Sequence, residues 1–230
     1  IIVFPRRNPS NPQTIKTISF WHYFGLFFWI AVSCLSALYV IVSRGEYKDF
    51  DGFYCNRVPD WFRVISILFI FSKYWEWLDT AILVWKGKTL HDIGFLHFYH
   101  HMTTVWVFSL TSNFAGTDKL GILLNGFVHT LMYFHYAFRL PKPFRPFITI
   151  AQILQLTWGT LSWNWNYERC AEYQGYYEAN PIAYWSIWCF VPVFLVFFIR
   201  FFIQSYLITP KSSSAAKIVP NDPSLKTKVE

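Results

Sequence analysis

Six apolar windows, each about as long as a bilayer's hydrocarbon core is thick, divide most of this chain. A helix needs about 20 apolar residues to cross that core, and such windows occur near 17–43, 61–85, 93–113, 120–138, 146–167 and 181–207. Of the 230 residues, 54% are hydrophobic and only 14% are charged, whereas a soluble domain carries about a quarter charged residues. The sequence therefore predicts an all-α fold, a polytopic membrane helix bundle with six spans in this chain.

Lysine and arginine residues lie mostly on one side of these predicted spans, and the richer side is usually cytosolic. Six spans return the chain to the side where it began. That side holds Arg6, Arg7, Lys16, Lys86, Lys88, Arg139, Lys142, Arg145, Lys211, Lys217, Lys226 and Lys228, and the other holds Arg44, Lys48, Arg57, Lys119 and Arg169. We therefore expect a cytosolic segment at 1–16, a membrane-embedded domain at 17–207 and a disordered cytosolic tail at 208–230. The net charge of +7 has two interpretations. It reflects only the orientation of the chain in the membrane, or it also attracts phosphorylated ligands to the cytosolic side.

The cysteines and the end of the tail also bear on compartment. Cys34 and Cys189 lie inside predicted spans, whereas Cys55 and Cys170 lie in two longer connections on the non-cytosolic side. An oxidising lumen would permit a bridge there. The tail ends in KTKVE, which resembles the dilysine signal that returns membrane proteins to the endoplasmic reticulum. A solvated basic tail is the alternative.

Four consecutive spans carry polar residues at helical spacing, although such groups are costly to bury in lipid. Residues three or four apart share a helix face. The stripes are Lys73, Glu76 and Thr80 with Asp79 on their flank, then His97, His100, His101 and Thr104, then Asn125, His129, Met132, Tyr133 and Tyr136, then Thr149, Gln152 and Gln155. One such stripe is more often interhelical packing, but four in consecutive spans favour a shared site.

The depth of these stripes predicts where they meet. With a rise of about 1.5 Å per residue, all four lie in the cytosolic half of their spans and can converge on one cavity that opens to the cytosol. We expect aromatic walls from Trp75, Trp77, Trp106 and Phe127, and an apolar extension toward the lumen. Such a cavity suits a molecule with a polar head and a long apolar tail.

These motifs, in this order, resemble the ELO family of very-long-chain fatty acid elongases, the 3-ketoacyl-CoA synthases of the endoplasmic reticulum. The matching motifs are Lys73-x-x-Glu76-x-x-Asp79-Thr80, His97-x-x-His100-His101, Asn125-x-x-Val128-His129-x-x-Met132-Tyr133 and Thr149-x-x-Gln152-x-x-Gln155. Family members have seven spans, and this chain begins at Ile1, so it resembles a member that lacks the first span. One departure is His135, which stands where the family has a tyrosine before Tyr136.

The resemblance implies a decarboxylative condensation of malonyl-CoA with a long-chain acyl-CoA, without a metal or redox cofactor. His100 is the expected carrier of the acyl group, and His129 would orient it or handle protons and the malonyl group. His97 and His101 would position these rings and stabilise oxyanions. The supporting network would comprise Lys73, Glu76, Asp79, Thr80, Asn125, Tyr133, Tyr136, Gln152 and Gln155. A ternary complex with His100 as general base is the alternative mechanism.

The resemblance further implies a luminal Cys55–Cys170 disulfide, membership of the endoplasmic reticulum membrane and a cytosolic carboxyl terminus. Asp92, where the polyunsaturated branch usually has Gln, favours saturated and monounsaturated chains. Expected partners are the ketoacyl-CoA reductase, the dehydratase and the enoyl-CoA reductase of the elongation cycle, with homo-oligomers left open and no nucleic acid.

Two other classes of protein share parts of this pattern. A membrane di-iron desaturase or hydroxylase also has an HxxHH box, but such a centre needs about eight imidazoles or equivalents. This chain has seven histidines, of which His22 and His91 lie off every stripe. A lipid transporter would have Gly or Pro interruptions in its spans, and the stripes here have none. Measurement of bound iron distinguishes the di-iron enzyme from an elongase. Release of carbon dioxide from malonyl-CoA distinguishes an elongase from a lipid transporter.

Overall fold

The computed structural model describes residues 12–111 and 117–208, and this part of the chain is helical with no strand. The prediction of an all-α fold is therefore confirmed. The longer helices are α1 Pro12–Ser43, α3 Asp60–Trp75, α4 Trp77–Trp85, α6 Phe95–Thr111, α7 Thr117–Phe138, α8 Arg145–Arg169 and α10 Pro181–Phe202. The shorter elements are η1 Glu46–Lys48, α2 Phe50–Cys55, α5 Leu90–Ile93, η2 Lys142–Phe144, α9 Ala171–Ala179 and η3 Ile203–Ile208.

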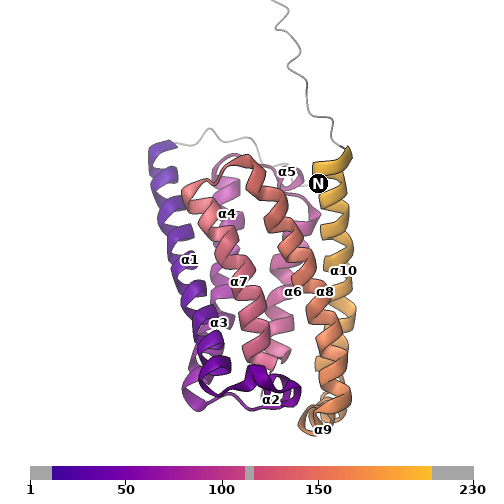
Figure 1. Ribbon diagram of the computed structural model, residues 1–230. Helices are drawn as coiled ribbons and strands as arrows, with labels where there is room; N and C mark the ends of the chain where they lie inside the picture. The colour runs from indigo at the N-terminus through magenta and orange to yellow at the C-terminus, as the bar shows by residue number, and fades with distance from the viewer. Residues whose placement is uncertain (1–11, 112–116, 209–230) are drawn as a thin grey trace, which may run out of the picture.

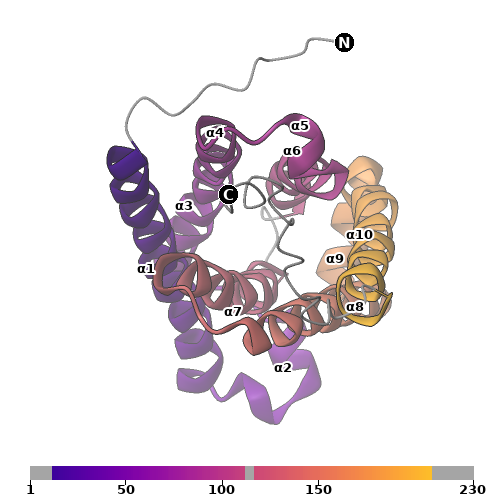
Figure 2. The same cartoon turned by 90° about the horizontal axis from the view of Figure 1, so that it is seen from above.

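The long helices run side by side and form a ring when seen along their axes (Figures 1 and 2). Around the ring the order is α1, the α3–α4 pair, α6, α10, α8 and α7. Helices α2 and α9 lie at the same end of the bundle, where Cys55 and Cys170 are bonded, and we call it the disulfide end. The opposite end carries Lys86, Arg139 and Arg145 at helix junctions, and we call it the basic end.

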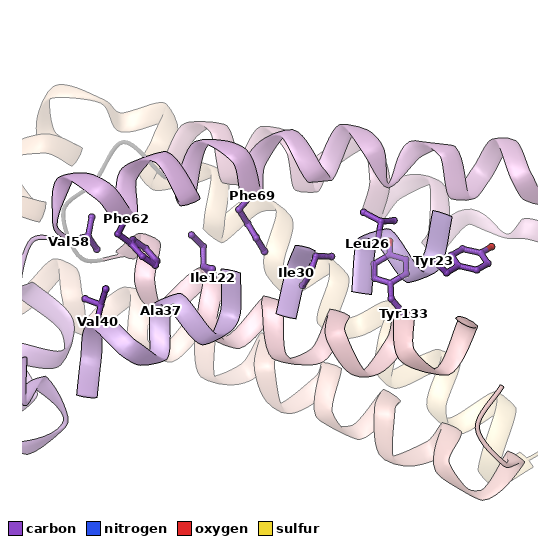
Figure 3. Close-up of a cluster of buried hydrophobic side chains, with 10 residues drawn as sticks. All are labelled: Tyr23, Leu26, Ile30, Ala37, Val40, Val58, Phe62, Phe69, Ile122 and Tyr133. Carbon is purple, nitrogen blue, oxygen red and sulfur yellow. The ribbon is translucent and has the colours of Figure 1, made fainter. Parts of the chain in front are cut away.

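One side of the ring is closed by apolar packing between α1, α3 and α7 (Figure 3). On α1 the buried residues recur every three, four or seven positions, as expected for one helix face. The cluster comprises Tyr23, Leu26, Ile30, Ala37, Val40, Val58, Phe62, Phe69, Ile122 and Tyr133. Helices α1 and α7 approach closely at Gly126, where a Cβ would lie 3.1 Å from Cβ of Cys34. A larger residue at Gly126 would push these helices apart.

Two helical segments are long and apolar enough to cross a membrane, Pro12–Ser43 and Pro181–Ile208. Their outer faces suit lipid: on α1, Trp21 and Phe28 are each 61% exposed and Leu35 is 62% exposed. Apolar side chains facing outward have no reason to avoid a bilayer. The count of six spans stays a prediction, and so do the proposed domain limits. The predicted tail beyond Ile208 lies outside the described residues.

The second predicted span is two helices instead of one. Helix α3 ends at Trp75, α4 begins at Trp77, and Glu76 lies at the joint. There the N–H of Asp79 donates to the carbonyl of Glu76 at 3.0 Å, an i to i+3 bond that tightens the turn. Neither Gly nor Pro marks this joint in the sequence. The apolar window 61–85 is therefore divided at Glu76 without the Gly or Pro that usually marks an interruption.

The disulfide end is held by an ion pair and a covalent bond. The ammonium of Lys119 donates to Oε2 of Glu46 at 2.7 Å, and to the carbonyls of Gly52 and Asn56 at 3.2 Å each. Burial lowers the pKa of this ammonium, while Glu46 acts in the opposite direction. Together these bonds fasten the connection between α1 and α3 to the start of α7.

The same connection is joined to α9 by the Cys55–Cys170 disulfide, whose Cα atoms lie 5.5 Å apart. The hydroxyl of Tyr173 adds a hydrogen bond to the carbonyl of Tyr54 at 3.2 Å. These contacts close the bundle at the end opposite the basic helix junctions.

Candidate active site

A buried ion pair ties α3 to α7 at the centre of the bundle. The ammonium of Lys73 donates to Oε1 of Glu76 at 2.7 Å and to Oδ1 of Asn125 at 2.9 Å. Both charged side chains are only 1% exposed. A charge at this depth is tolerable only when its partner is present. The first and third predicted stripes therefore meet through direct side-chain contacts.

Asp79 organises a second network between α4, α7 and α1. Its carboxylate accepts a 2.8 Å hydrogen bond from Tyr133 and lies 2.5 Å from Nε2 of His22. Because the indole N–H of Trp75 donates to Nδ1 of His22, a neutral His22 carries its proton on Nε2 and donates it to Asp79. Periodicity missed His22, since it is a lone histidine in an otherwise apolar span.

His100 and His129 face one another across the bundle. Their rings stack with centroids 5.7 Å apart and an angle of 23° between the planes. Nδ1 of His129 lies 3.6 Å from Oε1 of Glu76, which is too long for a hydrogen bond. The buried Nδ1 atoms of both histidines have no hydrogen-bond partner within the described part of the chain. Buried nitrogen atoms without partners, at a point where several polar side chains meet, are more typical of a ligand site than of simple packing.

His97 and His101 lie on the α4 side of His100. His97 Nε2 is 2.9 Å from Oγ1 of Thr80, and the indole N–H of Trp77 donates to the carbonyl of His101 at 2.8 Å. The ring of His101 lies 4.3 Å from that of His97 and 5.5 Å from that of His100. These contacts dock α6 on α4 and support the ring of His100.

An elongated cavity extends from these histidines between α6, α7, α8 and α10, with a volume of about 150 Å³. Gln152 and Gln155 line it together with His100 and His129. The remaining lining residues are Thr104, Val107, Phe108, Thr111, Leu120, Gly121, Leu124, Asn125, Leu156, Gly159, Ser162, Trp163, Asn166, Ile187, Val191, Phe194 and Phe198. His100 and His129 thus line one part of a mainly apolar chamber, and Trp163 and Asn166 line the part that lies toward the disulfide end.

The expected aromatic walls were wrong. Trp75, Trp77, Trp106 and Phe127 are between 47% and 64% exposed, and none of them lines the cavity. Tyr136 is also 45% exposed, with its ring 6.0 Å from that of Tyr133. Aromatic residues suit lipid as well as a protein interior, so their presence on a span did not predict which way they face.

Several lining residues escaped the sequence analysis. Phe194 of α10 packs its ring 5.4 Å from that of His100, and Trp163 and Asn166 of α8 line the far part of the cavity. The available signal for the latter two was the polar run WNWN, 163–166, near the end of a predicted span.

Glu76, His100 and His129 offer ligand atoms that all lie within 4.8 Å of one another. Two imidazoles and a carboxylate are suitable ligands for zinc or iron. However, Oε1 of Glu76 already accepts a hydrogen bond from Lys73 at 2.7 Å, and that ammonium would repel a second cation. The arrangement therefore suits acyl or proton transfer better than metal binding.

Comparison with known proteins gives a consistent result. A profile described as the GNS1/SUR4 family (ELO) matches residues 3–214, which include every motif above. Fatty acid elongase A of Dictyostelium discoideum is 30% identical over 221 residues, which covers 90% of this chain and 78% of that protein. Fatty acid elongase 2 of Trypanosoma brucei brucei is 30% identical over 190 residues, covering 74% of this chain and 64% of its own length. Very long chain fatty acid elongase 5 of Tachysurus fulvidraco is 29% identical over 180 residues, covering 72% and 56%.

Proposed function

The chain belongs to the GNS1/SUR4 (ELO) family of fatty acid elongases, and from this premise we propose that it catalyses the condensing step of elongation. In this step malonyl-CoA loses carbon dioxide, and the resulting enolate carbon attacks the thioester carbonyl of a long-chain acyl-CoA. Coenzyme A leaves and a 3-oxoacyl-CoA, two carbons longer, remains. The observation that carries the proposal is the pair of stacked histidines, which line a mainly apolar cavity.

His100 is the proposed acyl carrier. A neutral imidazole nitrogen attacks the thioester, the thiol of coenzyme A leaves with the proton, and an acyl-imidazole forms. The enolate then attacks the acyl carbon and the imidazole leaves as the new carbon–carbon bond forms. His129, 5.7 Å away between ring centroids, is the proposed proton carrier. A ternary complex in which His100 acts only as a base is the alternative mechanism.

The Lys73–Glu76 pair positions His129 in this proposal. Oε1 of Glu76 lies 3.6 Å from Nδ1 of His129, so its negative charge stabilises that ring when it takes up a proton. Lys73, which also donates to Asn125, holds the carboxylate in this position. The proposed role of this pair is therefore orientation of a reacting group.

The basic end is the proposed site for the phosphates of coenzyme A and the proposed cytosolic face. Lys86, Arg139 and Arg145 cluster at its helix junctions, and burial together with Arg139 lowers the pKa of Lys86. We also propose residence in the endoplasmic reticulum membrane, a cytosolic carboxyl terminus and a reaction without a metal cofactor. Saturated and monounsaturated chains are the proposed substrates, and the later enzymes of the elongation cycle are the proposed partners.

The first test is condensation by the protein in membranes or detergent. Carbon dioxide and 3-oxoacyl-CoA should form from malonyl-CoA and a long-chain acyl-CoA. His100→Ala and His129→Ala should abolish both products, whereas the control His91→Ala, an exposed residue of α5, should retain activity. Product formation at the wild-type level by either site variant would contradict the assignment. Oxygen-dependent desaturation with stoichiometric iron would favour the di-iron alternative.

A second test separates the two mechanisms. With acyl-CoA alone, an acyl-imidazole mechanism should release a burst of free coenzyme A and leave acylated His100 in the mass spectrum. A ternary mechanism releases none until malonyl-CoA is added.

A third test asks whether the acyl chain occupies the cavity. Gly159 lines it, and no heavy atom lies within 4 Å of the place where a Cβ would be. Gly159→Phe should fill the chamber midway and restrict elongation to shorter chains. Gly175→Phe is the matched control, because Gly175 has equal space on α9 but does not line the cavity. An unchanged product length in Gly159→Phe would place the chain elsewhere.

A further inference from the structure

The far part of the cavity carries a polar pair that condensation does not use. The run WNWN, 163–166, lies in the last turns of α8. Trp163 and Asn166, spaced by three residues, line the cavity and are only 6% and 2% exposed. The other two residues of the run do not line the cavity. Trp165 is 45% exposed, and the side chain of Asn164 donates a hydrogen bond to Glu168 at 2.8 Å. One tryptophan and one amide are thus directed to the chamber.

Both inward side chains have an unused polar atom. Nε1 of Trp163 and Oδ1 of Asn166 are buried and have no hydrogen-bond partner among residues 12–111 and 117–208. A buried polar atom without a partner carries a substantial free-energy cost, so native proteins generally provide one. Ser162 beside them differs, because its hydroxyl bonds to the carbonyl of Gly159 at 3.2 Å. The missing partners of Trp163 and Asn166 therefore point to a group that enters the cavity.

We propose that this pair binds a hydroxyl group at or near the far end of the acyl chain, so that ω-hydroxylated acyl-CoA is a substrate class of this protein. The inference rests on the proposed condensing function. An indole N–H only donates and the amide oxygen accepts, and a hydroxyl is the small group that can satisfy both at once. A ketone could not donate, and a carboxylate would bring an unpaired charge into an apolar chamber.

The depth of the cavity decides where along the chain the hydroxyl lies. Trp163 belongs to the same buried apolar cluster as Val107 of α6, and the seven residues of helix from His100 to Val107 span about 10 Å. Since each carbon–carbon bond adds at most about 1.5 Å, at least about 7 carbons separate the thioester from that level. The hydroxyl therefore belongs to the terminal part of a long chain, remote from the reacting carbonyl. Hydroxyl groups near the thioester would not reach the pair.

The test compares one long-chain acyl-CoA with its terminally hydroxylated form, using kcat/KM with malonyl-CoA. The wild type should elongate the hydroxylated chain at least as efficiently as the plain one. A chamber that was apolar throughout would instead disfavour the hydroxylated chain. Trp163→Phe and Asn166→Leu each remove one hydrogen bond and should shift the ratio of the two kcat/KM values about tenfold toward the plain chain. The matched controls Trp165→Phe and Asn164→Leu should leave the ratio unchanged. Asn166→Leu should also keep its thermal stability, because it removes an unpartnered polar group.

A wild-type preference of tenfold or more for the plain chain, unaltered in both inward variants, would overturn the inference and assign an ordered water to the pair. Binding of the two chains to His100→Ala protein, measured by competition, separates this inference from the condensing function. Tighter binding of the hydroxylated chain without any condensation by the wild type would contradict only the proposed function. Equal or weaker binding, with normal condensation of the plain chain, would contradict only the inference.

Discussion

Two lysine–glutamate pairs are buried in this bundle with nearly the same geometry. Lys73 and Glu76 lie 2.7 Å apart at its centre, and Lys119 and Glu46 lie 2.7 Å apart at the disulfide end. In both pairs each side chain is at most 1% exposed. Burial and distance alone would therefore assign them the same role.

They differ in what else their charged groups contact. The central pair touches side chains, Asn125 by a hydrogen bond and His129 at 3.6 Å, beside the cavity. The distal ammonium instead donates to the backbone carbonyls of Gly52 and Asn56, and the distal carboxylate also meets the partly exposed Arg44 at 3.2 Å, away from the cavity. A charge that meets side chains at a cavity can take part in chemistry, whereas one that meets backbone carbonyls holds a connection in place. Buried ionisable residues in a membrane protein are therefore candidates for function only after their further partners are known.

The largest expected effect comes from breaking either pair on one side. Lys73→Met should lower the free energy of unfolding by about 3–5 kcal/mol, because it leaves the buried carboxylate of Glu76 without its lysine. Lys119→Met should lower it by less, because Nε of Arg44 still lies 3.2 Å from Oε1 of Glu46. Denaturant unfolding in detergent measures this loss. A decrease below about 1 kcal/mol for Lys73→Met would show that the carboxylate of Glu76 finds another partner or becomes protonated at little cost.

Removing both members of a pair should separate the two roles. Replacing an ion pair by apolar residues is often neutral for stability, so both double variants should fold. Lys73→Met/Glu76→Leu should lower condensation by about 10²-fold or more, since an oriented charge beside the reacting rings is lost. Lys119→Met/Glu46→Leu should retain its activity per folded molecule. An equal loss of activity in both double variants would remove the distinction between the pairs.

The disulfide supports only the distal region, so its removal is the next effect in size. Cys55→Ser/Cys170→Ser should lower stability by about 2–4 kcal/mol, the typical contribution of a disulfide, while the folded protein keeps its activity. Thiol labelling of denatured, unreduced protein checks the bond directly, with Cys34 and Cys189 as the free-thiol controls. Alkylation of both Cys55 and Cys170 before reduction would show that no bridge exists.

The smallest expected effect is alkaline pH dependence at the distal pair. Burial lowers the pKa of Lys119 in the folded protein, whereas a lysine in the unfolded chain titrates near about 10.4. Between the pKa of the folded state and that of the unfolded state, the unfolded protein binds more protons than the folded protein. The free energy of unfolding therefore increases as the pH is raised through this window. Lys119→Met should lose this rise. Superimposable alkaline stability profiles of variant and wild type would contradict it.

Much of the site was predictable because helical periodicity encodes which residues share a face. The spacing of Lys73, Glu76 and Asn125 predicted polar stripes that meet, and the structure joins them directly. His100 and His129 were singled out for the same reason, and they lie ring to ring. The ordered set of motifs also identified the family, as the profile match over residues 3–214 confirms.

The sequence by itself determined a helical, strongly apolar chain with polar stripes at definite positions, since length and period are local properties of a helix. Only the tertiary structure decided how each helix is rotated about its axis and which neighbour it meets. That rotation brought His22 to Asp79, kept Trp75 out of the cavity and placed Trp163 and Asn166 in its lining. The physical reason is that lipid and protein interior are equally apolar, so hydrophobicity does not distinguish a lipid-facing side from a buried one.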